Sequence, residues 1–224
     1  MTNKYEPNFL LRGVAGSTAH GLARKGSDED LHGVFAWPTE AFWTFDKPAE
    51  SITGHEPQDF SYHELEKFLR LALANNPTIL EILWLEDYKD MDLVWGQMLL
   101  NHRTQFLHTS GVRNAYLGYA ESQFRKMLQR GGTFSSDTRN RTAKHARHLF
   151  RLLEQGESLL RTGEFSIKVA DRQWYLDLED MTAGQWVDIY FQRAEALADI
   201  KSVLPDEPDR TYFNDFLYTY REAH

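Results

Sequence analysis

The stretch Ala15–Phe35, AGSTAHGLARKGSDEDLHGVF, decides the fold that we expect for this chain. The residues before it, Phe9–Val14, form an apolar run typical of a short strand, and the small residues that follow predict a tight turn into a brief helix. Asp28–Trp37 then predicts a second strand. The adjacent carboxylates Asp28–Asp30 repel one another at the start of that strand, so a cation is their expected partner.

The composition indicates a folded protein. With 224 residues, 42% of them hydrophobic and 13% aromatic, the chain can bury a core as one large domain or two small ones. It contains no cysteine, which excludes disulfides and thiolate zinc sites. There is no apolar leader and no apolar run of about 20 residues, the length that spans a bilayer. We therefore expect a cytoplasmic protein that does not enter a membrane.

The net charge is unevenly distributed. The chain carries −8 in total. The stretch from Arg113 to Arg161 contains ten Lys and Arg residues and four acidic residues. Its net charge is therefore about +6, which leaves about −14 for the rest of the chain. The total argues against a general nucleic-acid-coating protein. The split predicts an acidic part and a basic part.

The pattern along the chain predicts an α+β fold followed by an α-helical domain, with domains at 1–90 and 91–224. After the two strands, Ser61 and Glu64 match a capping box ahead of a helical repeat that ends at Asn75-Asn76-Pro77. A second helix follows over Thr78–Leu85. From there on the pattern is helical, with helices expected at 92–108, 110–130, 138–162, 182–200 and 209–222.

The spacing of Asp28 and Asp30 predicts a metal site. Residues two apart in a strand point to the same face, so these carboxylates project together. With a third carboxylate they can share one or two Mg²⁺ ions, because Mg²⁺ prefers carboxylate oxygens and keeps positions open for phosphate. Two such ions stabilise the attacking and leaving oxygens of a phosphoryl transfer.

The Gly16-Ser17 pair fits the same chemistry. A glycine lets the backbone approach a triphosphate closely, and the serine hydroxyl and nearby N–H groups donate to phosphate oxygens. Such a pair is common by itself. Followed at this distance by Ser-Asp-x-Asp at a strand, it becomes specific.

The sequence resembles the DNA polymerase β nucleotidyltransferase superfamily, and within it a branch associated with RNA repair. Three stretches carry the resemblance: GSDEDLHGVF at 26–35, DFSYHELEKFLRLALANNPTILEILW at 59–84 and AKHARHLFRLLEQGESLLRTGEF at 143–165. The similarity spans about residues 10–170. It implies a nucleotidyltransferase palm with a small mixed sheet.

The resemblance also implies roles for individual residues. Asp28 and Asp30 match its metal-binding pair, and Asp59 is the expected third carboxylate, with Glu50 and Glu56 as rivals. Mg²⁺ or Mn²⁺ is the implied cofactor. Nucleotide or phosphate contacts are expected from Gly16, Ser17, Ser27, Lys67, Lys144, His148 and Arg151. The chain departs from the usual pattern at two positions, with His20 in place of Tyr and His32 in place of Arg, which puts nucleotide or acceptor choice in doubt.

Each assignment has a plainer alternative. Asp28 and Asp30 can form a solvated turn, Asp59 can be a residue of a helix start, and the basic residues of 141–151 can form a solvated face. His145 and His148 have the spacing of a transition-metal pair but lack a metalloprotease pattern. His55 and His63 are expected to be surface histidines. The Gly131-Gly132-Thr133 loop either wraps phosphate or is a plain connection.

The expected activity is transfer of an NMP from an NTP, ATP among the candidates, to an acceptor hydroxyl with release of pyrophosphate. An RNA end such as that of tRNA is the leading acceptor, and a protein or a small molecule is the alternative. A non-catalytic nucleotide or RNA sensor, or a scaffold that uses its helical half, would also fit the sequence. The oligomeric state and the NTP stay open.

Overall fold

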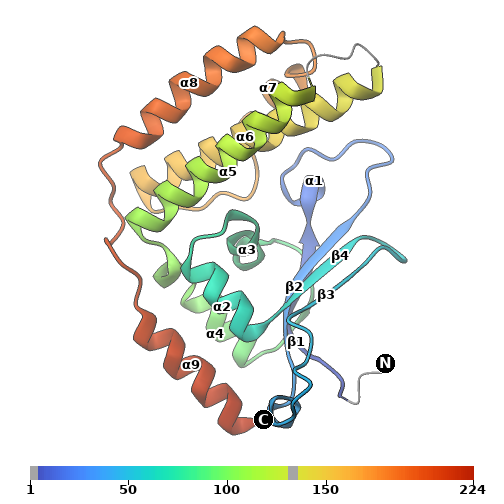
Figure 1. Cartoon of the computed structure of the whole chain (residues 1–224), viewed down its shortest axis with the longest axis vertical. Coiled ribbons are helices and arrows are strands. Elements are labelled where there is room, and N and C mark those ends of the chain that lie inside the picture. Colours follow the sequence, from blue (N-terminus) through green and yellow to red (C-terminus); the bar gives the residue numbers. More distant parts are fainter. Residues whose placement is uncertain (1–4, 131–135) are drawn as a thin grey trace. The chain divides into compact units, whose positions relative to one another are not determined.

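The first part of the chain contains a mixed five-stranded sheet in the order β3-β4-β2-β1-β5, of which Figure 1 labels β1 to β4. The computed structural model describes residues 5–130 and 136–224. β2 and β4 pair in parallel, whereas the other pairs are antiparallel. The strands are β1 (Asn8–Ala15), β2 (Asp30–Ala36), β3 (Ser51–Gly54), β4 (Phe60–Glu64) and β5 (Tyr88–Met91). The expected α+β class with a small mixed sheet is confirmed.

The chain divides into two compact units, Met1–Phe106 with Pro208–His224, and Leu107–Glu207. The first unit holds the sheet. Its helices are α1 (Gly16–Ala19), α2 (Leu65–Leu73), α3 (Pro77–Glu81), α4 (Trp95–Asn101) and α9 (Arg210–Ala223), with the short 3₁₀ turns η1 (Thr39–Trp43), η2 (Ile82–Trp84) and η3 (Arg103–Phe106).

The strand register assigns side chains to the two faces of the sheet. Leu31 pairs with Phe60, and His32 pairs with Ser61. Directly paired residues share a face, so the odd positions of β2 project to one side and the even positions to the other. The odd side carries an apolar cluster of buried and partly buried residues: Phe35, Trp37, Ala41 and Tyr62, with Tyr5, Phe9, Leu31, Phe42, Ile52 and Phe60.

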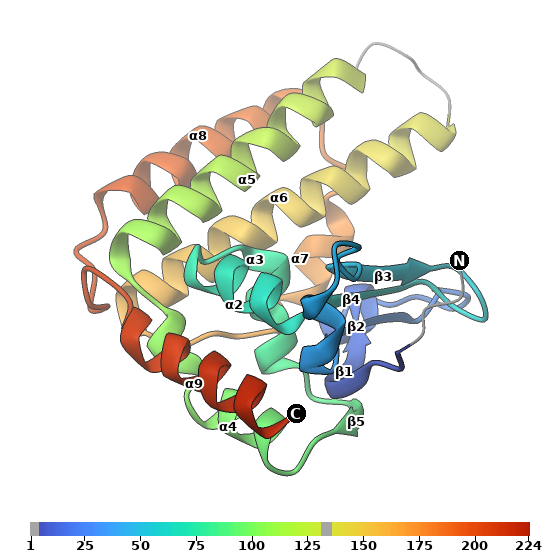
Figure 2. The same cartoon turned by 60° about the horizontal axis from the view of Figure 1, so that its bottom comes forward.

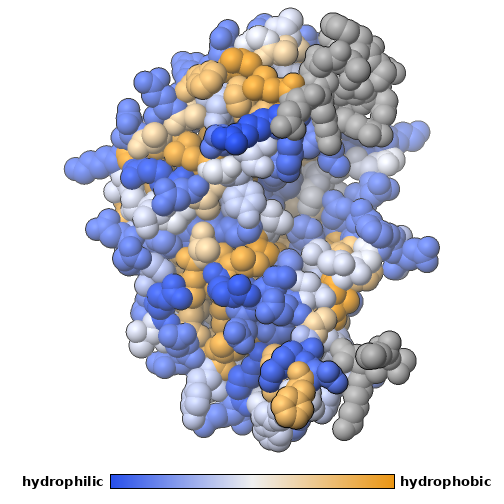
Figure 3. All heavy atoms as spheres, in the orientation of Figure 1, coloured by the Kyte–Doolittle hydropathy of each residue, from blue (hydrophilic) through white to orange (hydrophobic). Residues whose placement is uncertain are grey.

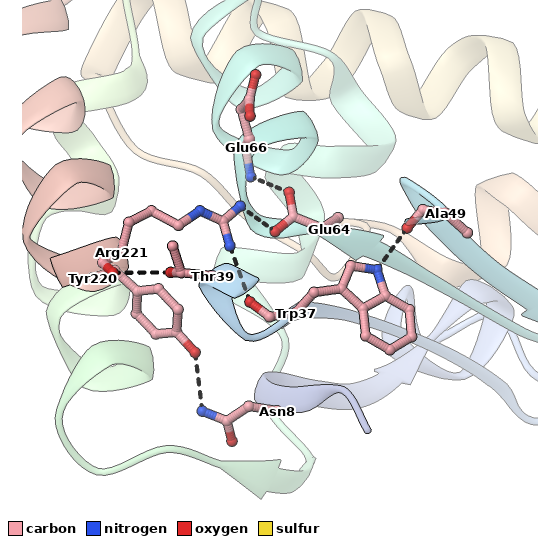
Figure 4. Close-up of polar contacts among 8 residues, drawn as sticks. All are labelled: Asn8, Trp37, Thr39, Ala49, Glu64, Glu66, Tyr220 and Arg221. Carbon is pink, nitrogen blue, oxygen red and sulfur yellow. Dashed lines mark hydrogen bonds and ion pairs between the residues drawn. The ribbon is translucent and has the colours of Figure 1, made fainter. Parts of the chain in front are cut away.

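Helix α9 is fastened to the sheet by polar contacts (Figure 4). The Arg221 guanidinium donates to Glu64 Oε1 at 2.6 Å and to the Trp37 carbonyl at 3.1 Å. Thr39 Oγ1 donates to the Arg221 carbonyl at 2.9 Å. At the next residue, the Tyr220 hydroxyl accepts from Asn8 Nδ2 at 3.1 Å. A helix more than a hundred residues away in sequence therefore completes the first unit.

The second unit is helical. It contains α5 (Thr109–Arg130), α6 (Ser136–Thr162), α7 (Arg172–Asp177) and α8 (Ala183–Asp199). The long helices α5 and α6 run side by side (Figure 2). Gly156 permits this approach, because a Cβ there would lie 3.0 Å from the Cβ of Tyr116. Helix α8 begins with a capping box between Thr182 and Gln185.

The surface seen in Figure 3 is mostly polar (blue), with apolar groups (orange) between the charged ones. In the first unit, large apolar side chains are exposed at Trp43, Phe45, Leu93 and Val94. Within 5–130 and 136–224, no helix is both long enough and apolar enough to cross a membrane.

Several predicted elements are corrected by the structure. The capping box at Ser61 is wrong, because residues 60–64 form β4 and the helix begins at Leu65. Its N-cap is Glu64, whose carboxylate accepts from the Glu66 amide at 2.8 Å. The sequence predicted neither strand β3 nor strand β5, and it predicted no helix where α7 lies. The Gly131-Gly132-Thr133 loop lies outside the described residues.

The compact units also differ from the expected domains. The first extends to Phe106 and takes in α9, whereas the sequence suggested domains at 1–90 and 91–224. Where the catalytic domain ends in a functional sense stays a prediction.

Candidate functional site

The Gly16-Ser17 turn begins where β1 ends. Gly16 has a φ of 62°, in the left-handed region that favours glycine. A Cβ on this residue would collide with the Asp30 carboxylate. The short helix closes through a hydrogen bond from the His20 amide to the Gly16 carbonyl at 3.1 Å. Both the backbone and the space at this position therefore require glycine, and Asp30 is the residue that lies against it.

Asp30 begins β2, and Asp28 lies in the irregular segment before it, so the predicted strand Asp28–Trp37 is corrected to Asp30–Ala36. Asp30 is the first residue of the strand, is half-buried and pairs with Ala15 at the end of β1. Asp28 is exposed, two residues earlier. The structure thus brings Asp30 to the Gly-Ser turn, while Asp28 lies before the strand and is not part of its alternation of faces.

Asp59 lies beside the same end of the sheet. It comes directly before β4, and its carbonyl accepts from the Leu31 amide at 2.8 Å. Its carboxylate, however, accepts from His55 Nδ1 at 2.7 Å, and both side chains are largely exposed. Among the residues that the structure describes, no three His, Asp or Glu side chains are gathered closely enough to hold one metal ion. The expected carboxylates are of the right type for Mg²⁺ but are not preassembled around one point.

A band of polar side chains lies on the even face of the sheet. On β2 this face carries Asp30 and His32, and on β4 it carries Ser61 and His63. Burial lowers the pKa of His32, against the opposing effects of the Glu81 and Asp30 carboxylates. His20 Nε2 lies 3.1 Å from Glu81 Oε2, and both of these side chains are buried.

His63, Ser51 and Lys67 form the other end of this band. Lys67 Nζ donates to Ser51 Oγ at 2.9 Å, and Ser51 Oγ lies 3.0 Å from His63 Nδ1. Burial, followed by the charge of Lys67, lowers the pKa of His63 to about 4. The imidazole is therefore neutral near pH 7, and Lys67 supplies a positive charge there. His63 is half-buried, so its assignment as an ordinary surface histidine is wrong.

The predicted basic residues of α6 differ from one another in exposure. Lys144 is exposed, and His148 is half-buried. Arg151 is buried and donates to Gln155 Oε1 at 3.0 Å and to His148 Nδ1 at 2.9 Å. Arg147 is paired with Glu179 at 2.6 Å. The side chain of Arg141 lies outside the described part.

The family model for RlaP, described as the RNA repair pathway DNA polymerase beta family, matches residues 1–181. This chain belongs to that family. The membership confirms the resemblance derived from the sequence and the predicted enzyme class, a nucleotidyltransferase of the polymerase β superfamily. No curated protein is similar enough to count as a relative.

Among solved structures, this member of the RNA repair pathway DNA polymerase beta family is similar to a nucleotidyltransferase-like protein from Exiguobacterium sibiricum. The identity is 12%, the match covers 98% of this chain and 75% of the other, and the TM-score is 0.36.

The sequence analysis did not assign three residues near the site of this family member. Ser51 and His63 lie in the polar band, and Glu81 lies on α3, paired with His20. Only Glu81 gives a signal in the sequence. It is a single carboxylate inside the apolar run ILEILW, and a charge in such a run is usually buried with a partner. Ser51 and His63 meet only because β3 pairs with β4.

Proposed function

We propose that this protein transfers an NMP from an NTP to the terminal hydroxyl of an RNA and releases pyrophosphate. One observation carries the proposal: the Asp30 carboxylate lies against the glycine of the Gly16-Ser17 turn, at the edge where β1 and β2 pair. A carboxylate and a phosphate-binding turn at one point are what a metal-bound nucleotide needs. The family description, RNA repair, supports RNA as the acceptor.

Asp28 and Asp30 would hold Mg²⁺ or Mn²⁺, and Asp59 would complete the set. When bound, the ions would supply charge stabilisation for the phosphoryl group and for the leaving pyrophosphate. The carboxylate of Asp59 first has to release His55. Because both of these side chains are exposed, that exchange requires no rearrangement of the core. Asp59 would then be free to take the proton of the acceptor hydroxyl.

The triphosphate would lie along the turn and the polar band. Gly16 and Ser17 would donate to its oxygens, and so would Ser27, whose hydroxyl accepts from the Arg24 amide at 2.8 Å and keeps its own proton for a ligand. Lys67 would neutralise the outer phosphates. Its Nζ donates to Ser51 Oγ at 2.9 Å, and an ammonium group has two further N–H donors that can bind phosphate oxygens.

In the second unit, residues of α6 would bind phosphate groups of the RNA acceptor. Lys144 and His148 are the accessible members of the predicted set. Arg151 is buried, so its part in this proposal is to orient His148. The guanidinium can only donate, so His148 Nδ1 accepts and the ring keeps its proton on Nε2. The reaction is proposed for the cytoplasm, whose reducing conditions suit a chain without cysteine.

The direct test uses each α-radiolabelled NTP, Mg²⁺ or Mn²⁺, and an RNA with a free terminal hydroxyl. We expect labelled RNA and a matching release of pyrophosphate. The control RNA carries a terminal phosphate in place of the hydroxyl and should stay unlabelled. Label that appears on the blocked RNA equally, or on protein or small molecules alone, would contradict an RNA hydroxyl as the acceptor.

A non-catalytic sensor is the second candidate, and one observation favours it. The carboxylates are not gathered into a metal site in the described residues, and Asp59 is hydrogen-bonded to His55. A sensor would bind NTP in the presence of Mg²⁺ without releasing pyrophosphate from any NTP and RNA combination. The same assay therefore separates the two functions.

A further inference from the structure

A buried hydrogen bond joins His20, the residue that follows α1, to Glu81, the last residue of α3. His20 Nε2 and Glu81 Oε2 lie 3.1 Å apart, and their side chains are 10% and 5% exposed. A carboxylate only accepts, so Nε2 carries the proton. Neither side chain belongs to the residues that we assign to metal or phosphate.

The elements around the pair fix its position. Glu81 is the last residue of α3, whose start is fixed by Pro77 and by the Asn76 side chain, which accepts from the Ile79 amide at 3.3 Å. His20 directly follows α1, and its amide donates to the Gly16 carbonyl at 3.1 Å. The side chain of His20 is thus held by α3, while its backbone closes the turn at Gly16.

The pair also lies near the metal-binding end of β2. The His20 amide donates to the carbonyl of Gly16, and Gly16 is the residue against which the Asp30 carboxylate lies. Because Asp30 lies against Gly16, a shift of the turn would move the contact between the glycine and the carboxylate as well. A chain of contacts therefore runs from Glu81 through His20 and Gly16 to Asp30.

We propose that His20 and Glu81 are a positioning pair that holds the Gly16-Ser17 turn in the geometry that receives the β- and γ-phosphates of the NTP. This inference rests on the proposed function. Two buried polar groups that satisfy each other are costly to separate, so the bond resists displacement of the turn when ligand is absent. The turn is then ordered before the nucleotide arrives, which reduces the entropic cost of binding.

The test compares substitutions of similar length that keep or remove the hydrogen bond. His20→Gln keeps an N–H near the position of Nε2, and His20→Met removes it. At the partner, Glu81→Gln keeps an acceptor, and Glu81→Met removes it. For each variant, calorimetry measures the Kd of tripolyphosphate with Mg²⁺ and the Kd of AMP, which lacks the β- and γ-phosphates.

We expect both Met variants to raise the Kd of tripolyphosphate about tenfold, the factor for about 1.4 kcal/mol, and the Kd of AMP less than about twofold. Both Gln variants should stay within about threefold of the wild type. Equal losses for the two ligands would indicate a general loss of structure and overturn the inference. So would unchanged Kd values in both Met variants.

Two further outcomes, unfolded Met variants and a wild type that binds neither ligand, also bear on the inference. If neither Met variant folds, Glu81→Asp replaces them, because it withdraws the carboxylate by one methylene, and the same selective loss for tripolyphosphate is expected. If the wild type binds neither ligand, the proposed function fails and the inference fails with it. Binding by the wild type with no selective loss in the variants refutes the inference alone.

Discussion

The two ends of β2 differ in burial and in partners. Residues Asp30–His32 are half-buried, whereas Gly33–Ala36 are fully buried. The first end carries a carboxylate and a histidine beside a glycine turn. The second runs into the aromatic cluster, where the rings of Phe35 and Trp37 meet edge to face at 5.2 Å. A single strand thus has a polar end suited to chemistry and an apolar end suited to stability.

The two ends of β2 support the candidate site in different ways. Charged groups lose less hydration at the half-buried end, so Asp30 is tolerated there without a cationic partner from the core. The buried end is held by the aromatic cluster and by α9, through Arg221 and the Trp37 carbonyl. Rigid elements position functional groups more accurately than loops do, and β2 supplies such an element.

Replacing the carboxylates should give the largest effect and should leave the buried end unchanged. Asp28→Asn combined with Asp30→Asn removes the charges while keeping the side-chain shape against Gly16. We expect label transfer to fall by about 10³-fold or more, because charge stabilisation of the phosphoryl group is lost. The midpoint of thermal unfolding should change little.

Glu29→Gln is the matched control. Glu29 lies between the two aspartates in the sequence, and its carboxylate accepts from Gln58 Nε2 at 3.3 Å. It should retain nearly full activity. Equal loss of activity in this control would mean that the local negative charge matters and that the individual carboxylates do not, which contradicts the division of β2 into two ends.

Arg221→Ala tests the buried end of β2, and we expect it to give the second-largest effect, on the free energy of unfolding. This change leaves Glu64, 4% exposed at its side chain, without its cation. We expect the free energy of unfolding at pH 7 to drop by about 3–5 kcal/mol, the usual cost of breaking a buried pair by removing one partner. Urea unfolding measures the drop, and the binding of Mg²⁺ and NTP should persist below the new unfolding midpoint.

The pH dependence of the same variant sharpens this test. Burial already raises the pKa of Glu64, with Arg221 acting in the opposite direction. Removing Arg221 raises that folded-state pKa further, so the folded state binds more protons than the unfolded state above the ordinary value of 4.5. The destabilisation should therefore grow as pH rises from about 4.5, and a constant destabilisation would exclude Glu64 as its cause.

The sequence was most informative at the polar end of β2. Gly16, Asp28 and Asp30 are close in sequence. The apolar runs and the small residues around them predict a strand, a turn and a second strand from local patterns alone. The same local reasoning failed at β4. Ser61 and Glu64 match a capping box, but residues 60–63 also alternate in polarity, and pairing with β2 decides in favour of the strand.

Contacts between distant segments could not be predicted. Arg221 and Glu64 are 157 residues apart, and no local pattern connects them. His63 likewise meets Ser51 only through the pairing of β3 with β4. The preference of Asp59 for His55, four residues earlier, depends on loop geometry that the sequence does not encode in any simple pattern.

A smaller effect is expected from Lys67→Met, which tests how far the polar end extends along the sheet. Lys67 Nζ donates to Ser51 Oγ, and two more N–H donors of its ammonium group can bind further acceptors. We expect the KM for NTP to rise about tenfold with kcat little changed, because one charge-assisted contact to phosphate is lost. Lys47→Met is the control, since Lys47 is exposed and donates to the Phe42 carbonyl near the apolar cluster. An equal rise in both variants would indicate a general charge effect.

The smallest effect concerns the pH dependence of stability through His63. Its pKa is about 4 in the folded state against an ordinary value of 6.5, so between these values the unfolded state binds more protons. This group therefore favours the folded state above pH 6.5, and its contribution is lost as pH falls toward 4. His63→Gln removes the dependence. Because solvent screens a half-buried ring, we expect the difference in unfolding free energy between variant and wild type to shift by less than about 1 kcal/mol between pH 7 and pH 5, in favour of the variant.

In Lys67→Met the folded-state pKa of His63 should rise, measured by NMR titration of the ring, since Lys67 contributes to its depression. An unchanged pKa would mean that burial alone sets it and that the positive charge does not act on this part of the band.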